Sequence, residues 1–66
     1  MFKVKLISTV NSKVIEDVEE ETLVNALITL RNLINMNTFE DEVIYKVENG
    51  VLKAIGYEEV CILEEG

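Results

Sequence analysis

Apolar and polar residues alternate along the first ten positions of the chain, with Val4 and Leu6 on one side and lysines on the other. A period of two is typical of a half-buried strand. An Asn-Ser pair follows, and Asn tolerates the left-handed backbone that a tight hairpin turn needs. The pattern therefore predicts a strand over residues 2–10, a turn at 11–12 and a returning strand over 13–18.

The period then changes to that of a helix. Four large apolar residues recur at intervals of four, three and four positions, and they are Leu23, Leu27, Leu30 and Ile34. This spacing places them on one side of an α-helix, so an amphipathic helix is expected over residues 20–35.

Two alternatives remain for the start of this helix. Asp17 and Glu20 have the spacing of a capping box, and Thr22 is the cap if the helix begins later. Under the first alternative Glu19, Glu20 and Glu21 lie in the first turn, where the helix dipole favours negative charge.

Val24 and Ile28 lie about 100° or more around the predicted helix from the centre of its apolar stripe. They widen the apolar face beyond what one sheet normally covers. We expect them to extend the core, and the alternative is an exposed strip that contacts another protein.

A second hairpin is predicted in the last third of the chain. Residues 42–48 alternate, Asn49-Gly50 follows, and residues 51–55 return. Asn-Gly is a strong hairpin signal because both central positions of a type I′ turn need a positive φ. Gly56 indicates a bend or bulge, and residues 60–63 are expected to form a short last strand or to continue the previous one.

The predicted order is β-β-α-β-β with an optional fifth strand, in a single domain over residues 1–66. We expect an α+β fold, with one antiparallel sheet of four or five strands and one amphipathic helix packed on one face. On the other face we expect Ile7, Ile15, Ile44 and, in one possible register, Cys61. Because a water-facing sheet surface is usually polar, these residues favour a second layer supplied by another chain.

The chain is strongly acidic, with 13 Asp and Glu against 6 Lys and Arg and a net charge of −7. This charge repels phosphate backbones and anionic lipid, and it attracts basic partners. Direct binding to nucleic acid or to a membrane is therefore not expected. The acids gather in two segments, which comprise Glu16, Asp17, Glu19, Glu20, Glu21, Glu40, Asp41 and Glu42.

Residues suited to catalysis are few. The chain has no His, and its single Cys61 lies among apolar and acidic neighbours that raise a thiol pKa. Zinc needs Cys and His clusters, and the acids lack the spacing of a calcium loop. We expect no enzyme activity, no metal and no cofactor. One cysteine, no signal peptide and no long apolar run predict a cytoplasmic protein.

Two functional hypotheses follow. In the first, the chain is a protein-binding module, such as a phage or mobile-element inhibitor that occupies the surface of a host defence or nucleic-acid protein. The acids would imitate phosphate charge or steer the encounter, with Val24, Ile28 or Tyr57 as apolar anchors. In the second, the chain is a self-assembling or accessory subunit, and its acids only prevent aggregation. Both hypotheses predict a homo-oligomer or a hetero-complex subunit.

Overall fold

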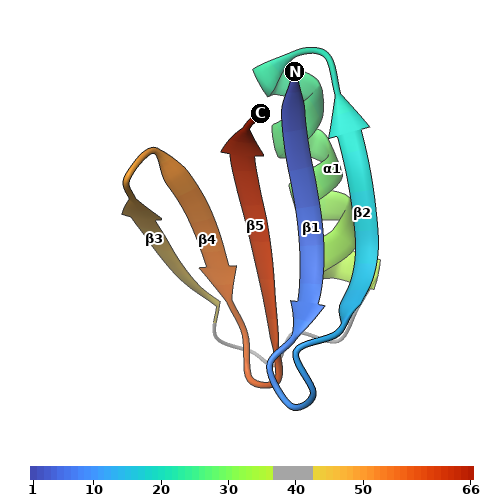
Figure 1. Ribbon diagram of the computed structural model, residues 1–66, viewed down its shortest axis with the longest axis vertical. Helices are drawn as coiled ribbons and strands as arrows, with labels where there is room; N and C mark the ends of the chain where they lie inside the picture. Colours follow the sequence, from blue (N-terminus) through green and yellow to red (C-terminus); the bar gives the residue numbers. More distant parts are fainter. Residues whose placement is uncertain (37–42) are drawn as a thin grey trace.

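The computed structural model describes residues 1–36 and 43–66 of the chain. These residues form five strands and one helix, in an α+β fold with the helix packed against a single antiparallel sheet (Figure 1). The predicted fold class is therefore confirmed. The elements are β1 (Phe2–Ser8), β2 (Val14–Glu20), α1 (Leu23–Met36), β3 (Ile44–Glu48), β4 (Val51–Ile55) and β5 (Glu59–Glu65).

The strands are arranged in the order β2-β1-β5-β4-β3, so the last strand of the chain lies in the middle of the sheet. The predicted short strand at residues 60–63 is instead a separate strand of seven residues. It pairs along its whole length with β1, from Ser8 opposite Glu59 to Phe2 opposite Glu65. On its other side β5 pairs with β4 through residues 60–63, so the middle of β5 is paired at both edges.

The hydrophobic core lies between α1 and the central strands. Strand pairing places Val4 opposite Leu63, and Leu6 opposite Cys61. These side chains pack with the buried face of the helix, and the buried set is Val4, Leu6, Ala26, Leu30, Leu33, Ala54, Cys61 and Leu63. Cys61 therefore faces the helix, and the suggestion that it points to the open face is wrong.

The first hairpin differs from its prediction. Strand β1 ends at Ser8, and a loop at residues 9–13 replaces the expected two-residue turn. The Ser8 N–H donates to the carbonyl of Lys13 at 2.9 Å, and the Lys13 N–H donates to Oδ1 of Asn11 at 3.0 Å. Ser12, not Asn11, has the positive φ of 59°. These local hydrogen bonds stabilise the longer loop.

The helix begins three residues later than expected, because Thr22 is its cap. The Asn25 N–H donates to Oγ1 of Thr22 at 3.2 Å, and the Ala26 N–H donates to the Thr22 carbonyl. The capping box of Asp17 and Glu20 is wrong, since both residues belong to β2. No acid lies in the first turn of α1, so the expected contribution of Glu19–Glu21 to the helix dipole is also wrong.

The second hairpin agrees with its prediction. Asn49 and Gly50 have φ angles of 52° and 77°, and Glu48 pairs with Val51 across the turn. Positive φ at both central positions is the type I′ geometry that matches the twist of the strands. The Glu42 end of the predicted strand lies outside the described residues, and β3 begins at Ile44.

Gly50→Ala should lower the free energy of unfolding by about 1–2 kcal/mol, because an L side chain at this positive φ is strained. No heavy atom lies within 4 Å of the position a Cβ would take, so the cost comes from the backbone and not from a clash. Urea denaturation measures it. The control is Asn49→Gly, which keeps the turn. Equal losses for the two variants would contradict the turn argument.

Within the described parts of the chain, no helix has both the length and the apolar character that a membrane span requires.

Candidate protein-binding surface

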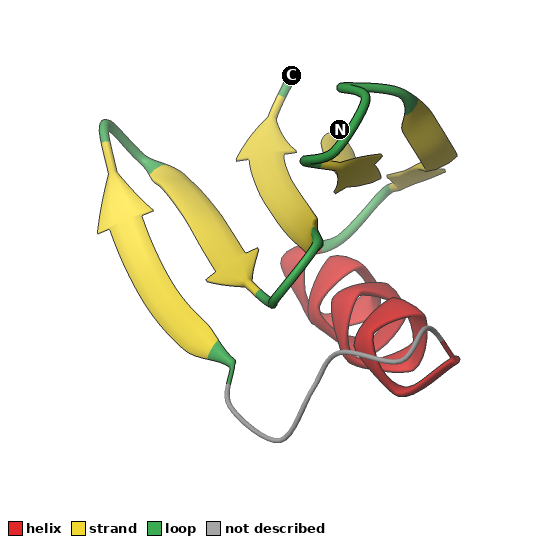
Figure 2. Cartoon of the chain, turned by 90° about the horizontal axis from the view of Figure 1, so that it is seen from below, coloured by secondary structure: helices red, strands yellow, loops and turns green. Residues whose placement is uncertain are grey.

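The helix covers only part of one sheet face. Within the described residues, α1 lies over β1, β5 and β2, and the β3–β4 hairpin reaches the core only through Ala54 and Leu52 of β4. Figure 2 shows the hairpin standing to one side of the helix. In the described part of the chain, no helix therefore lies over the helix side of β3.

A hydrogen bond at the other edge of the sheet shows which side of α1 faces β2. The Thr29 hydroxyl donates to Oε2 of Glu20 in β2. The buried side of α1 is formed by Ala26, Leu30 and Leu33. At about 100° per residue around the helix axis, Thr29 lies roughly 70° from the centre of this side, and Leu27 lies roughly 90° from it in the other direction. Because β2 and β3 are opposite edges of the sheet, the Leu27 side of the helix is directed toward the hairpin.

Several apolar side chains of the helix are exposed. Leu23 and Leu27 are half exposed on the side directed toward the hairpin, at 48% and 42%. Val24 and Ile28 lie farther around, away from the sheet, and are 66% and 52% exposed. The expectation that Val24 and Ile28 extend the core is therefore wrong, because the sheet lies on the opposite side of the helix. We call these four residues the outer helix surface.

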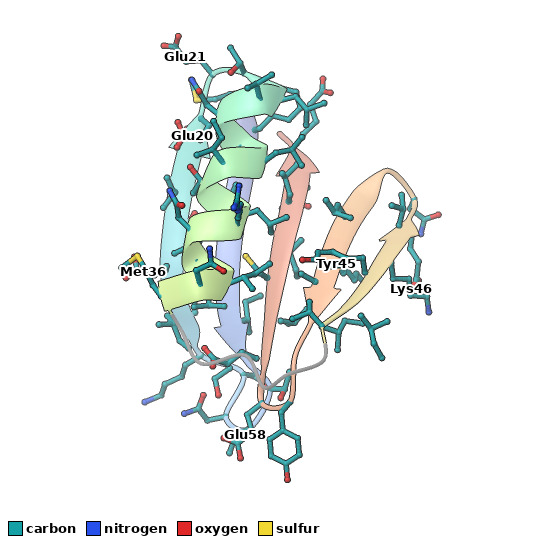
Figure 3. All side chains as sticks on the ribbon, turned by 180° about the vertical axis from the view of Figure 1, so that it is seen from behind. Glu20, Glu21, Met36, Tyr45, Lys46 and Glu58 are labelled. Atoms are coloured by element: carbon teal, nitrogen blue, oxygen red, sulfur yellow. The ribbon has the colours of Figure 1, made fainter. Side chains whose placement is uncertain are left out.

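The hairpin carries apolar residues on the helix side as well. Tyr45 lies opposite the buried Ala54, and Val47 lies opposite Leu52, so all four share the face that the helix occupies elsewhere. Tyr45 and Val47 are 61% and 69% exposed. Figure 3, drawn from the helix side, shows Tyr45 extending over β4. We call Tyr45, Val47 and Leu52 the hairpin surface.

The outer helix surface and the hairpin surface are poor in acids. Helix α1 contains no Asp or Glu, and Arg31 is its only charged residue. Strand β4 carries Lys53 as its only charge. Strand β3 carries one acid, Glu48, which alternates with Tyr45 and Val47 and so lies on the other face of the sheet. Large exposed apolar area without like charge is typical of a protein contact.

The predicted acidic residues are not gathered on one face. Glu16 and Glu20 lie on the helix side of β2, since they pair with Leu6 and Phe2. Asp17 and Glu19 lie on the other side, where they pair with Lys5 and Lys3. The remaining members are placed as follows: Glu21 precedes the helix, whereas Glu40, Asp41 and Glu42 lie outside the described residues.

The open face of the sheet is mixed in character. A row of apolar residues crosses all five strands, and it consists of Val14, Ile7, Val60, Ile55 and Ile44. The expected positions of Ile7 and Ile44 on this face are thus confirmed. However, the same face carries Lys3, Lys5, Lys46 and Lys53, because each alternates with residues directed to the helix side. The aliphatic stems of lysines can cover apolar neighbours while their amines remain in water. The sequence favoured a second layer from another chain on this face, and the lysines weaken that expectation.

No reactive centre is evident in the described residues. Cys61 is fully buried, and desolvation raises its thiol pKa to about 11, which disfavours the thiolate that a nucleophile needs. The described residues contain no group of three or more His, Cys, Asp or Glu that could hold a metal ion.

Comparison with protein-family models, with curated proteins and with solved structures finds no match to this chain. The candidate surface therefore rests on the structure itself. Sequence reasoning identified Val24 and Ile28 but missed Tyr45 and Val47. Their alternation with Ile44 and Lys46 was visible, but nothing local indicated that the helix leaves β3 uncovered. Tyr57, the third predicted anchor, is 76% exposed in the loop between β4 and β5.

Proposed function

We propose that this protein is a protein-binding module that acts through the outer helix surface and the hairpin surface. One observation carries the proposal: in the described residues α1 does not cover Tyr45 and Val47 of the β3–β4 hairpin, and apolar residues of both elements remain exposed on the same side of the sheet. Burial of such residues contributes about 25 cal/mol per Å² of apolar area, so exposing this many without a partner is costly. The supporting charge argument is the absence of acids from α1 and β4.

Two occupants are compatible with this function. The first is a foreign protein, in the cytoplasm, whose surface the module blocks, as a phage or mobile-element inhibitor would do to a host protein. The second is another subunit in an assembly. In either case we propose that the acids of β2 and β5 provide solubility and steering, because in each strand they are divided between the two faces of the sheet.

A pull-down of tagged protein from bacterial lysate tests this function at low salt and at about 0.5 M salt, where the Debye length is roughly 4 Å. A partner bound by the apolar surface should survive the high-salt wash and be lost from the Ile28→Glu variant. The matched control is Met36→Glu, which adds the same charge to the same helix on the β2 side. A partner that is lost at high salt and released by charge reversal of Glu19–Glu21, but retained by Ile28→Glu, would favour charge mimicry and contradict the proposal.

A further inference from the structure

We infer that a second copy of this chain covers the proposed binding surface, with α1 of each copy lying against the β3–β4 hairpin of the other. The inference rests on the proposed function, because both require this surface to be a protein contact, and it names the occupant. The arrangement is a two-fold dimer in which the two helices form one layer between two sheets.

Each copy has two exposed surfaces that the other copy can cover. In the described residues, no helix lies over Tyr45 and Val47 of the hairpin surface, and no strand lies over the outer helix surface. Within one chain these surfaces cannot meet, because α1 is already held on β1, β5 and β2. A two-fold axis beside the helix places the partner's α1 over the hairpin surface. The same axis places this copy's α1 over the partner's hairpin surface. Such a self-complementary patch is what a two-fold interface requires.

This arrangement brings exposed apolar side chains of the two surfaces into contact between the copies. Leu27, on the side of the helix directed toward the hairpin, meets its equivalent in the partner helix near the axis. Ile28 and Val24, on the side away from the sheet, meet the partner's hairpin surface. Tyr45 extends over β4 on the helix side (Figure 3). In the dimer it contacts the partner helix.

The distribution of acids limits where two copies of the chain can meet. Two copies that each carry a net charge of −7 repel one another, so a stable contact between them must avoid acids. The acid-bearing β2 edge, with Glu16, Asp17, Glu19 and Glu20, is the least suitable place. Helix α1 and strand β4 carry no acid, which makes them the most suitable. Arg31 is the one charge of α1, and its long stem allows the guanidinium to reach the rim of the contact.

The area of the two surfaces is sufficient for a weak dimer. A helix of 14 residues is about 21 Å long, and half the circumference of a cylinder about 10 Å wide gives roughly 300 Å² of outer helix surface. Two five-residue strands add roughly 170 Å². The pair of copies therefore buries roughly 900 Å² as a flat footprint, which is the size of a weak or transient interface.

Analytical ultracentrifugation over a range of about 1 μM to 1 mM tests the dimer, and these concentrations bracket the affinity expected of a small interface. The wild-type protein should sediment as a dimer in the upper part of the range. Ile28→Glu and Val47→Lys should each raise the dissociation constant at least about tenfold, because a charge would be buried without a partner. Met36→Glu, on the β2 side of the same helix and at its last residue, should leave it unchanged. Circular dichroism should show that each variant is folded.

A mixture of the two interface variants tests the reciprocal contact directly. In a mixed dimer the introduced glutamate meets the introduced lysine at one contact, and the other contact is wild-type. Mixing Ile28→Glu with Val47→Lys should therefore restore dimers that neither variant forms alone, and the restored dimers should weaken at high salt.

A monomer up to about 1 mM, a dimer unaffected by both interface variants, or a mixture that stays monomeric would each overturn the inference, since any specific interface of this size would form by that concentration. These outcomes leave the proposed function separately testable. A monomer that still captures a foreign protein at high salt, and loses it with Ile28→Glu, would retain the module and replace the occupant. A dimer that resists both variants, together with a pull-down insensitive to Ile28→Glu, would remove both.

Discussion

Leu6→Ala should lower the free energy of unfolding by about 2–5 kcal/mol, the range measured when a large buried aliphatic side chain is truncated. Leu6 is fully buried at the centre of the core, opposite Cys61 in the register and beneath α1. A chain of 66 residues has roughly 3–10 kcal/mol of stability in total, at about 0.05–0.15 kcal/mol per residue. The variant is therefore expected to be close to unfolded at 37 °C.

Urea denaturation followed by circular dichroism measures this loss, and Ile7→Ala is the matched control. Ile7 is the next residue of β1, but it lies on the open face of the sheet and is only partly buried. Its truncation should cost about 1 kcal/mol, because little transfer energy and no closed cavity are involved. Equal losses at the two positions would mean that the open face is covered as completely as the helix side, which contradicts the layer arrangement.

The contrast between Leu6 and Ile7 is also the part of the fold that local sequence predicts best. Alternation in β1 assigned Leu6 and the lysines to opposite faces, the four-three-four spacing from Leu23 predicted the helix, and Asn49-Gly50 predicted the second turn. Each signal lies within a few residues and depends on backbone geometry that neighbours alone determine.

The features that sequence reasoning missed depend on contacts between distant segments. The position of β5 in the middle of the sheet requires pairing with β1, more than fifty residues earlier in the chain. The irregular register between Leu6 and Ile7 redirects the start of β2, so the facing of its residues could not be counted from alternation alone. The local spacing of Asp17 and Glu20 likewise predicted a capping box at the start of the helix. Both residues instead lie in β2 and pair with β1.

The candidate surface shows the same division. Helical spacing alone placed Val24 and Ile28 away from the centre of the apolar stripe. Whether a second layer reaches them depends on how wide the sheet is and where α1 lies on it, which is a property of the strand order. The Thr29–Glu20 hydrogen bond lies at the β2 edge, and the exposed part of the helix-side face lies at β3, the opposite edge. Identifying Tyr45 and Val47 therefore required the strand order and the exposure of each side chain.

Alkaline destabilisation through Cys61 is the second large effect that we expect. Burial raises the pKa of the Cys61 thiol from 9.0 to about 11. The folded state therefore holds this proton more tightly than the unfolded state does. Its contribution to stability is fully present below pH 9 and is lost as the pH rises from about 9 to about 11. A difference of about two pKa units corresponds to about 3 kcal/mol at the upper end of this window.

Urea denaturation at several pH values between 8 and 11 measures this loss, with Cys61→Ala as the control. The control is expected to be less stable at pH 8, because it removes buried volume from the core. It should nevertheless lose less stability than the wild-type protein as the pH rises, since the thiol no longer titrates. The difference between the two curves isolates Cys61 from the lysines and tyrosines that both proteins share. Parallel curves over the whole window would mean that the thiol titrates alike in the folded and unfolded chains, and that Cys61 is not enclosed between the sheet and α1.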